Sequence, residues 1–584
     1  MTSSKMHIER PAKTGDIAYQ RRPDDTSIAA KAEQSITAAT IDEAAKLHGV
    51  QYSASERELL LETISGQLAA VETVRSIARP IDLQPAIVFD PRLPGTEYRK
   101  QRNEVRLAAG DPGPLPSSDD DIAFASVTAL SWWIRVGALS SARLTEIYLA
   151  RIARLAPALK CFVTVTGDIA RAQARLMDEE LRMGRYRGRL HGIPYGLKDV
   201  FDTAGIPTTW GSSLYANRIP PADATIVTQL REAGAVLLGK LATAELANGY
   251  EWFGGACMSP WNLEEPAGGS SSGSGSATAA GLCAFSIGTD SLGSIINPAD
   301  RCGVVGLRAT FGRVPVKGSM PLTPSLERIG PLCRTVEDAA VVLAVLNGPD
   351  PSSASSVDVG FEYDAHCDLR LKVGYSPAWF KEIGYAPGTG VPASKAHLDV
   401  LPALEKLGAQ LVEIQLPPLP YDSLFTLLEV ETAAIFEHLT LTDVDDRLVK
   451  QGPFAWPNIW RKARLLSAVD YLQLERFRRQ VMWVMGDVFS EVDMLVAPTY
   501  GSYQLLWITN FTGHPGVTVR VGFQNSPTRA MNFVVDDPAG PTFRIPQNIT
   551  LHGRLYEEGT ILAVARALER EFDVWQERPP VTAG

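Results

Sequence analysis

Residues 268–315 read GGSSSGSGSATAAGLCAFSIGTDSLGSIINPADRCGVVGLRATFGRVP, and this stretch decides the fold. Its first nine residues have the composition of a flexible Gly/Ser linker. A linker joins independent units and carries little apolar structure, whereas here the glycines continue directly into SATAAGLCAFSIG. That continuation is typical of a helix of small residues followed by a buried strand. The stretch therefore predicts a tightly packed backbone inside a domain.

Two other interpretations of the Gly/Ser block fit less well. A phosphate-binding loop ends in Gly-Lys-Ser/Thr, and this ending is absent from the block. Residues 269–273 match the GxSxG pattern of a nucleophile elbow, with Ser271 as the nucleophile. That elbow follows an apolar strand, and the preceding residues 260–267, PWNLEEPA, do not form one.

On both sides of this block the chain alternates between helix and strand patterns. Apolar residues recur at helical spacing over residues 144–155, and a second helix is predicted over 223–233. The apolar segments 161–165, 235–238 and 494–497 predict short buried strands. Such alternation is typical of an α/β architecture in which a sheet lies between layers of helices.

Composition and charge argue against several classes of function. The net charge is −10, the pI is about 5.5 and no basic stripe is visible, so a nucleic-acid partner is not expected. The six cysteines form no CxxC pair and the eight histidines form no HxH or HExxH cluster, so neither a metal nor another cofactor is expected. No run of eighteen apolar residues occurs, and the pair Arg21-Arg22 is followed by Pro23 rather than by the apolar stretch of an export signal. A cytoplasmic protein without a membrane span is expected.

Several blocks of the chain resemble the amidase signature family. The usual family form is a GGSSGGS block, then a GTDxGGSIRxPA block, then a GxxGLKPTxGR block. The chain has GGSSSGS at 268–274, GTDSLGSIINPA at 288–299 and GVVGLRATFGR at 303–313. Upstream, HGIPYGLKDVFDTAGIPTTWGS at 191–212 is similar to the family segment that carries a catalytic lysine. The resemblance covers residues 122–350 and, more loosely, the C-terminal hundred residues.

The resemblance implies a large mixed, twisted β-sheet between helices and an enzyme that hydrolyses amide bonds. By position, the catalytic lysine is Lys198, the bridging serine in a cis peptide is Ser270, and the nucleophile is Ser294, 24 positions beyond Ser270. A serine hydroxyl must pass its proton to a base as it attacks. A buried lysine can be that base, because desolvation disfavours the ammonium ion and lowers its pKa. Ser270 would relay the proton between the two.

The turn before the nucleophile supplies the second part of such a site. The backbone N–H groups of Ser291, Leu292, Gly293 and Ser294 can converge on the oxyanion of a tetrahedral intermediate. Gly293 gives the backbone the freedom that a tight turn requires.

The second and third blocks depart from the usual family pattern at several positions. Leu292 replaces a glycine, and residues 308–310, Arg-Ala-Thr, replace Lys-Pro-Thr. Ile296 replaces an arginine, so that Asp290 loses its expected ionic neighbour. The altered blocks resemble a branch of the family with a TLGSI-type signature, and the three catalytic positions are retained.

The substrate is expected to be a small amide with an acyl or aryl group. Trp252 and Phe253, just before the Gly/Ser block, are candidate walls of the substrate pocket and equally candidate core aromatics. Two alternatives stay open: a carbamate or ester hydrolase of the same family, and a non-catalytic amidase-like binding protein.

The N-terminal part lies outside the resemblance. Residues 1–34 are polar and predict a tail, and the capping-box patterns of Thr40 with Glu43 and of Ser53 with Glu56 each predict the start of a helix. The Pro-, Gly- and Asp-rich stretch 111–121 marks a boundary. We expect a helical extension over 1–118 and the catalytic domain over 119–584. The extension could pack on that domain, cover an active-site mouth or form a homodimer contact, and these alternatives stay open.

Overall fold

The computed structural model describes residues 36–77, 79–108, 110–385, 390–535 and 537–582 of the 584-residue chain. The chain divides into two compact units, residues 1–83 with 465–467, and residues 84–464 with 468–584. The tail predicted for residues 1–34, with its arginine pair, lies outside the described residues. The domain boundary predicted after residue 118 stays a prediction.

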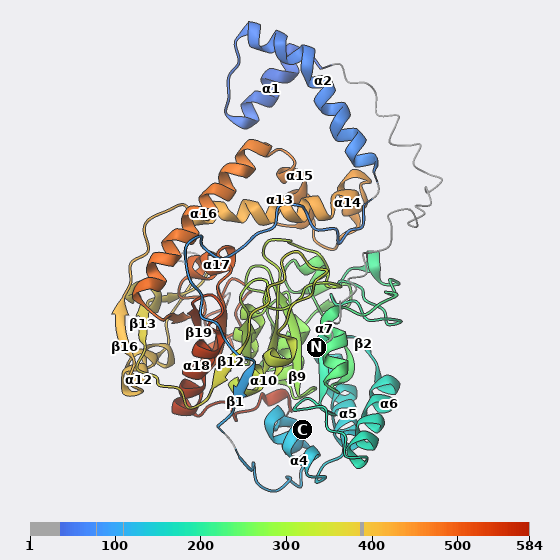
Figure 1. Ribbon diagram of the computed structural model, residues 1–584, viewed down its shortest axis with the longest axis vertical. Helices are drawn as coiled ribbons and strands as arrows, with labels where there is room; N and C mark the ends of the chain where they lie inside the picture. The colour runs from blue at the N-terminus through green and yellow to red at the C-terminus, as the bar shows by residue number, and fades with distance from the viewer. Residues whose placement is uncertain (1–35, 78, 109, 386–389, 536, 583–584) are drawn as a thin grey trace, which may run out of the picture. The chain divides into compact units, whose positions relative to one another are not determined.

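The described residues of the first unit form the helices α1 (Ala38–His48) and α2 (Ala54–Ser76), drawn in blue in Figure 1. Ser53 caps α2 in a reciprocal box with Glu56, as the sequence predicts. The predicted start of α1 is wrong: the N-cap is Thr37, and Thr40 is the third helical residue of the box. The hydroxyl of Thr40 accepts a hydrogen bond from the backbone N–H of Thr37, which is the bond that a glutamate usually accepts at this position of a capping box.

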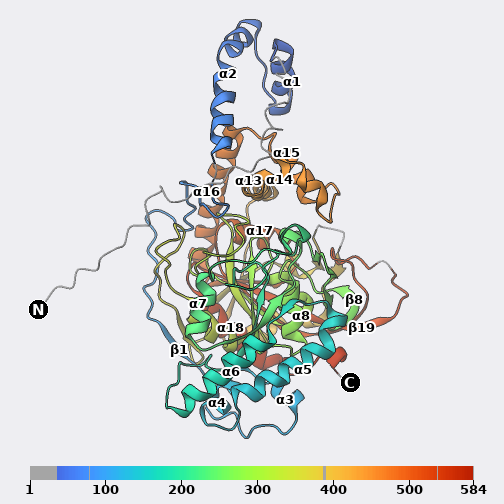
Figure 2. The same ribbon diagram turned by 90° about the vertical axis from the view of Figure 1, so that its right-hand side faces the viewer.

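The second unit is built on an 11-stranded sheet (Figures 1 and 2). In spatial order its strands are β16 (Gln410–Glu413), β13 (Lys372–Tyr375), β17 (Met494–Pro498), β19 (Thr542–Gly553), β18 (Gly516–Pro527), β10 (Val305–Arg308), β11 (Arg328–Cys333), β9 (Phe285–Asp290), β3 (Pro194–Lys198), β4 (Val236–Leu241) and β2 (Phe162–Val165). Strands β16, β13 and β17 are parallel, as are β9, β3 and β4, and the other neighbours are antiparallel. The expectation of a large mixed sheet is confirmed.

Helices surround this sheet. They are α3 (Asp119–Phe124), α4 (Val127–Arg135), α5 (Ser141–Leu159), α6 (Gly167–Arg182), α7 (Thr225–Glu232), α8 (Ser272–Ala279), α9 (Ile296–Cys302), α10 (Val336–Leu346), α11 (Lys395–Leu398), α12 (Val400–Lys406), α13 (Phe425–Ile435), α14 (Glu437–Leu441), α15 (Trp456–Ala463), α16 (Ala468–Glu491), α17 (Tyr503–Phe511) and α18 (Glu558–Phe572). Every residue of β3, β4, β9, β10 and β11 is buried, so both faces of the sheet centre are covered. Among the helices of the described residues, none is long and apolar enough to cross a membrane.

Four short two-stranded sheets complete the unit. They pair β1 (Glu104–Arg106) with β12 (Glu362–Asp364), β5 (Glu251–Trp252) with β6 (Gly255–Ala256), β7 (Met258–Ser259) with β8 (Asn262–Pro266), and β14 (Glu382–Ile383) with β15 (Val391–Pro392).

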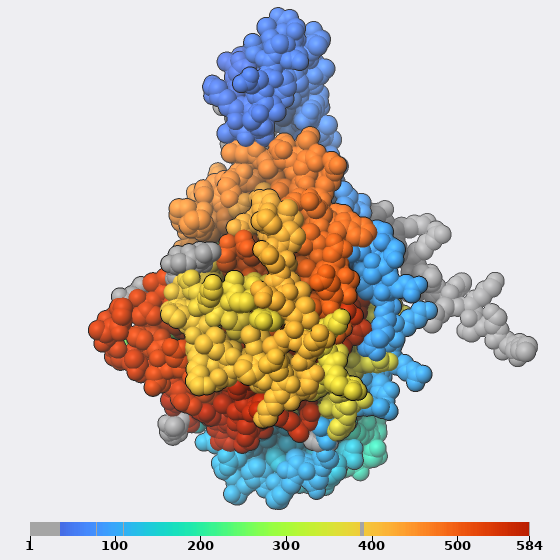
Figure 3. Space-filling view, turned by 90° about the vertical axis from the view of Figure 1, so that its left-hand side faces the viewer, coloured from blue at the N-terminus to red at the C-terminus, as the bar shows by residue number. Residues whose placement is uncertain are grey.

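The predicted strands differ in burial according to their place in the sheet. Residues 236–238 of the segment 235–238 lie in β4, and the segment 494–497 lies in β17; both strands are buried throughout. The segment 161–165 forms β2, but the prediction of a buried strand is wrong there, since β2 is only partly buried. The reason is its place at the edge of the sheet, where it pairs with β4 alone. At the opposite edge, β16 is also partly exposed and contributes with α12 to the surface shown in Figure 3.

The Gly/Ser block is packed inside the second unit, as the sequence predicts. All residues of α8 are buried. Its serines bond to the adjacent strand: the hydroxyl of Ser274 donates to the carbonyl of Ile287 at 3.1 Å, and the hydroxyl of Ser286 donates to the carbonyl of Ser274 at 2.9 Å. Small side chains therefore let the helix lie close to β9 while their hydroxyl groups find partners.

A buried ion pair joins the last signature block to the C-terminal helix α18. The guanidinium of Arg313 donates to Glu558 at 2.8 Å, and both side chains are fully buried. Glu558 also accepts the backbone N–H of Thr310 at 2.8 Å. The carboxylate thus satisfies two donors that have no access to water.

Replacing Glu558 with Leu is expected to lower the free energy of unfolding by about 3–5 kcal/mol, because the Arg313 charge would stay buried without its partner. Urea unfolding followed by circular dichroism measures this loss. The control is Asp399→Ala, which removes an exposed i,i+4 pair with Lys395 and is expected to cost less than about 1 kcal/mol. Equal losses in the two variants would contradict the prediction.

Candidate active site

Lys198 is the last residue of β3 and is fully buried. Its Nζ donates to the hydroxyl of Ser270 at 2.8 Å and to the hydroxyl of Thr289 at 2.8 Å. The structure therefore brings together two of the three residues that the resemblance singled out. Thr289 lies near the end of β9, which is the parallel neighbour of β3, and this pairing brings Thr289 beside Lys198.

Burial changes the protonation of this lysine. Loss of water lowers the pKa of Lys198 to about 8, and the carboxylates of Glu327 and Asp290 oppose part of that shift. A lysine with such a pKa has a sizeable neutral fraction near neutral pH, which an exposed lysine lacks. The amine can therefore accept a proton.

The backbone at Gly269 and Ser270 is held by hydrogen bonds and close packing. The peptide bond between Gly269 and Ser270 is cis, as the resemblance implies for the bridging serine. The backbone N–H of Ala244 donates to the carbonyl of Ser270 at 3.1 Å, and the N–H of Gly269 donates to the side chain of Asn297 at 2.8 Å. A Cβ atom at Gly269 would lie 1.7 Å from the carbonyl oxygen of Gly249, so only glycine fits there.

Ser294 lies on the turn between β9 and α9 and is partly exposed. Its carbonyl oxygen accepts the backbone N–H of Ser271 at 3.2 Å. The turn that carries Ser294 is thus bonded directly to the residue after Ser270. Ser271, the serine of the alternative elbow pattern, is fully buried and donates its hydroxyl to the carbonyl of Thr289 at 3.1 Å.

Asp290 shapes this turn through backbone amides. Its carboxylate accepts the N–H of Gly293 at 2.6 Å, of Ile295 at 2.8 Å and of Ile296 at 3.3 Å. The expectation that Gly293 offers its amide to an oxyanion is therefore corrected, because that amide already bonds to Asp290. Gly293 serves the turn instead, with a φ of 94° that other residues rarely adopt.

The charge of Asp290 is balanced from an unexpected direction. The sequence shows Ile296 where an arginine would stand, yet Arg308 on β10 and Arg328 on β11 both interact electrostatically with Asp290. Arg328 is the direct partner of Asp290 in the pairing of β11 with β9. The two arginines are buried, and burial lowers the pKa of Arg308 to about 10. A charge on the neighbouring strands thus replaces one on the helix.

Sequence reasoning missed a further carboxyl group beside the site. The hydroxyl of Ser291 donates to Glu327 at 2.6 Å and accepts from the hydroxyl of Thr323 at 2.8 Å. Glu327 is buried just before β11. In the sequence Glu327 is followed directly by Arg328 at the start of a strand, and nothing in that local pattern indicates a place beside the site.

The candidate wall residues Trp252 and Phe253 have other surroundings. The indole N–H of Trp252 donates to the carbonyl of Lys160 at 3.1 Å, and the ring of Phe253 is 40% exposed and packs edge-on against Trp252. The two rings contact each other, and Trp252 also bonds to Lys160; their place in the wall of the substrate pocket stays a prediction. The backbone of Gly249 and Tyr250, shortly before them, is what contacts Gly269.

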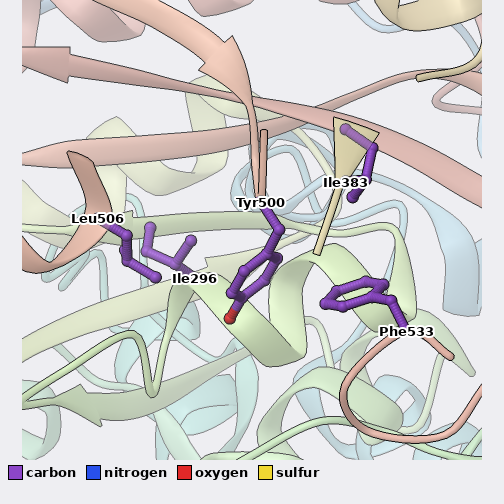
Figure 4. Packing of buried hydrophobic residues seen from close by; sticks show 5 residues of the cluster. All are labelled: Ile296, Ile383, Tyr500, Leu506 and Phe533. Atoms are coloured by element: carbon purple, nitrogen blue, oxygen red, sulfur yellow. The ribbon is translucent and has the colours of Figure 1, made fainter. Parts of the chain in front are cut away.

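An apolar cluster borders the turn instead (Figure 4). Its buried members are Ile296, Ile383, Tyr500, Leu506 and Phe533, and Tyr385, Val391, Ala393 and Trp507 pack against it. A Cβ atom at Gly293 would lie 3.1 Å from Leu506 and 3.8 Å from the Tyr500 hydroxyl oxygen. The sequence could not indicate this cluster, because its members come from separate segments that meet only in the fold.

The site itself offers hydroxyl groups, a lysine amine and backbone amides. The described residues contain no group of three or more His, Cys, Asp or Glu side chains placed to hold a metal ion.

A family model described as Amidase matches residues 143–534. The chain belongs to the amidase family. Residues 1–142 lie outside this match.

Named relatives and a solved structure agree with this membership. The amidase is 31% identical to a glutamyl-tRNA(Gln) amidotransferase subunit from Carboxydothermus hydrogenoformans, over 79% of this chain and 99% of that protein. It is 34% identical to a Mycobacterium tuberculosis protein named as a putative amidase, AmiD, over 81% of this chain and 100% of that protein. The crystal structure of a peptide amidase from Stenotrophomonas maltophilia is similar to it with a TM-score of 0.65 and 28% identity, over 78% of this chain and 98% of that chain. The amidase is accordingly a C–N hydrolase that acts on amides.

Replacing Asp290 with Asn is expected to lower the free energy of unfolding of this amidase by about 1–3 kcal/mol, because the amide NH₂ group cannot accept from the backbone N–H groups of the turn. Chemical denaturation measures the loss. Asp368→Asn is the control, since Asp368 is exposed and forms its ion pair with the exposed Arg370, and its cost is expected to stay below about 0.5 kcal/mol. A loss no larger in the Asp290 variant than in the control would show that the carboxylate does not hold the turn.

Proposed function

We propose that this amidase cleaves small acyl or aryl amides through an acyl-enzyme on Ser294, with Ser270 as the bridging serine and Lys198 as the base. The observation that carries the proposal is the pair of 2.8 Å hydrogen bonds from the buried Nζ of Lys198 to the Ser270 and Thr289 hydroxyl groups. A buried lysine whose partners are hydroxyl groups is suited to accept and release a proton, rather than to stay permanently charged as an ammonium ion.

In the first step Ser294 attacks the substrate carbonyl carbon. Its proton passes to Ser270, whose own proton passes to the neutral amine of Lys198. When the C–N bond breaks, the ammonium returns a proton through Ser270 to the nitrogen of the leaving amine. The amine departs neutral, and the acyl group stays on Ser294 as an ester.

In the second step water hydrolyses that ester. The water gives a proton to the same relay as it attacks, and Ser294 recovers a proton when the acyl group leaves as a carboxylic acid. The enzyme returns to its starting protonation state. Each proton that the relay accepts is thus delivered again within the same half-reaction.

The oxyanion of each tetrahedral intermediate requires hydrogen-bond donors. We assign this role to the backbone N–H groups of Ser291, Leu292 and Ser294, since these three donate to no acceptor among the described residues, while Gly293 is engaged by Asp290. Removal of one such donor typically costs about 3 kcal/mol of transition-state stabilisation.

The apolar cluster beside Gly293 favours a substrate with an apolar or aryl group. Tyr385 and Trp507, which pack against the cluster, are both partly exposed, so aromatic surface is available near the turn. A ring can pack against such side chains with centroids about 4.5–7 Å apart. Carbamates and esters with the same groups remain alternative substrates, and glutamine is the comparison substrate that the name of the amidotransferase relative suggests.

Ser294→Ala is expected to abolish hydrolysis of anilides, aliphatic amides and aryl carbamates and to abolish covalent labelling by a fluorophosphonate. Ser271→Ala is the matched control, since it removes another serine hydroxyl, one residue from Ser270. This variant is expected to be labelled like the wild type, because the Ser271 hydroxyl already bonds to the backbone carbonyl and N–H of Thr289. Initial rates and mass spectrometry of the labelled peptide measure the two effects. Labelling that survives in Ser294→Ala would refute the nucleophile assignment, and a folded wild type that neither labels nor turns over would support the non-catalytic alternative.

The dependence of rate on pH tests the base. Because Lys198 must be neutral to accept a proton and its pKa is lowered to about 8, kcat/KM is expected to rise with pH and to level off above pH 8. An anilide without ionisable groups is the substrate of choice, since only the enzyme then titrates. A profile that is flat across this region would contradict a role for Lys198 as the base.

A further inference from the structure

Glu327 is a buried carboxyl group that the proposed mechanism does not use. It lies just before β11, with 7% of its surface exposed. The Ser291 hydroxyl donates to it at 2.6 Å. Because Ser291 Oγ also accepts from Thr323, its single proton points to Glu327. The carboxyl group thus acts as an acceptor and fixes the first residue of the turn that leads to Ser294.

A second hydroxyl group lies beside both the lysine and Glu327. Thr289 Oγ1 accepts from Lys198 at 2.8 Å. In the pairing of β9 with β11, Thr289 lies opposite Ile329, two residues after Glu327, so the Thr289 and Glu327 side chains lie on the same face of the sheet. The Thr289 hydroxyl and the Lys198 ammonium both favour the ionised form of Glu327 and so lower its pKa. Glu327 therefore bonds to the turn before Ser294 through Ser291 and lies on the side of the sheet where Thr289 bonds to Lys198.

Other charged groups surround this carboxyl group. Lys198 comes from β3, Asp290 from β9 and Arg328 from β11, while Arg308 on β10 faces Arg328. The Arg328 guanidinium is committed elsewhere, since it donates to the carbonyl oxygens of Leu326, Thr509, Asn510 and His514 and to the side chain of Asn510. The Glu327 carboxylate accepts instead from the hydroxyl group of Ser291.

We propose that Glu327 is a positioning residue with two effects. It holds the turn of residues 291–294 through Ser291 and, by its negative charge, sets the pH at which Lys198 gives up its proton. This inference rests on the proposed function of Lys198 as the base. Burial raises the pKa of Glu327, whereas the hydroxyl groups of Ser291 and Thr289 and the ammonium of Lys198 stabilise its ionised form. In turn, the negative charge favours the ammonium form of Lys198 and raises the lysine pKa.

The test is the pH profile of kcat/KM for Glu327→Gln. Removing the negative charge disfavours the ammonium form, so the pKa of Lys198 falls and the rising limb of the profile moves to lower pH. We expect a shift of about one pH unit, the lower end of what a neighbouring opposite charge produces. We also expect kcat to fall about tenfold with KM little changed, since a neutral amide oxygen accepts from Ser291 more weakly than a carboxylate does and holds the turn less firmly. The proposal would be overturned if the Gln variant is active and its kcat/KM rises over the same pH range as that of the wild type.

Two further variants separate charge from packing. Glu327→Asp keeps the charge and shortens the side chain, so its limb is expected to stay at the wild-type pH with a lower plateau. If the rising limb of the Asp variant shifts to lower pH by a full unit, the proposal is refuted, even where the Gln variant fails to fold. Glu569→Gln is the matched control: Glu569 is also buried with a raised pKa, yet it accepts the N–H of Val336, remote from Lys198. Its pH profile is expected to equal that of the wild type.

Failure of this inference is distinguishable from failure of the proposed function. If Ser294 is not the nucleophile, the fluorophosphonate label is not found on Ser294, either in the wild type or in any Glu327 variant. If only the role of Glu327 is wrong, labelling at Ser294 persists and the limb of the Gln variant coincides with that of the wild type.

Discussion

The site depends on a buried lysine whose direct hydrogen-bond partners are hydroxyl groups. Lys198 donates to Ser270 and Thr289. Lys240, on the neighbouring strand β4, also donates to a hydroxyl group, that of Thr208, but has the carboxylate of Asp199 at 3.3 Å. Both lysines are fully buried. A carboxylate holds an ammonium ion in its charged form, while a hydroxyl group accepts from the ammonium and can donate to the neutral amine. The close carboxylate therefore distinguishes the surroundings of Lys240 from those of Lys198.

Such a lysine requires a closely packed and rigid surrounding. The centre of the sheet supplies it, since β3 and β9 are buried along their whole length. The small residues of α8 let the chain around Ser270 come near the lysine, and Asp290 ties the following turn through its backbone amides. The arginines of β10 and β11 then balance the charge of Asp290. The geometry of the candidate site therefore depends on the sheet as well as on the loops.

Local patterns in the sequence predicted elements well where local physics decides them. The box of Ser53 and Glu56 begins α2 as expected, because it involves only neighbouring groups. For α1 the same reasoning chose the wrong threonine, since Thr37 and Thr40 are both suitable capping residues and the sequence does not rank them. The segment 161–165 has the pattern of a buried strand, and only its place at the sheet edge leaves it partly exposed. Five residues do not specify whether a strand lies at the edge or at the centre of its sheet.

Motif order and spacing were enough to predict the family, the mixed sheet and the proximity of Lys198 to Ser270, because a signature block encodes a local backbone path and the residue types that its chemistry needs. Contacts between distant segments could not be predicted this way. The role of Glu327, the engagement of the Gly293 amide and the apolar cluster around Tyr500 each arise where separate strands and loops meet. Their partners are set by the packing of the whole sheet, in which residues far apart in the chain become neighbours.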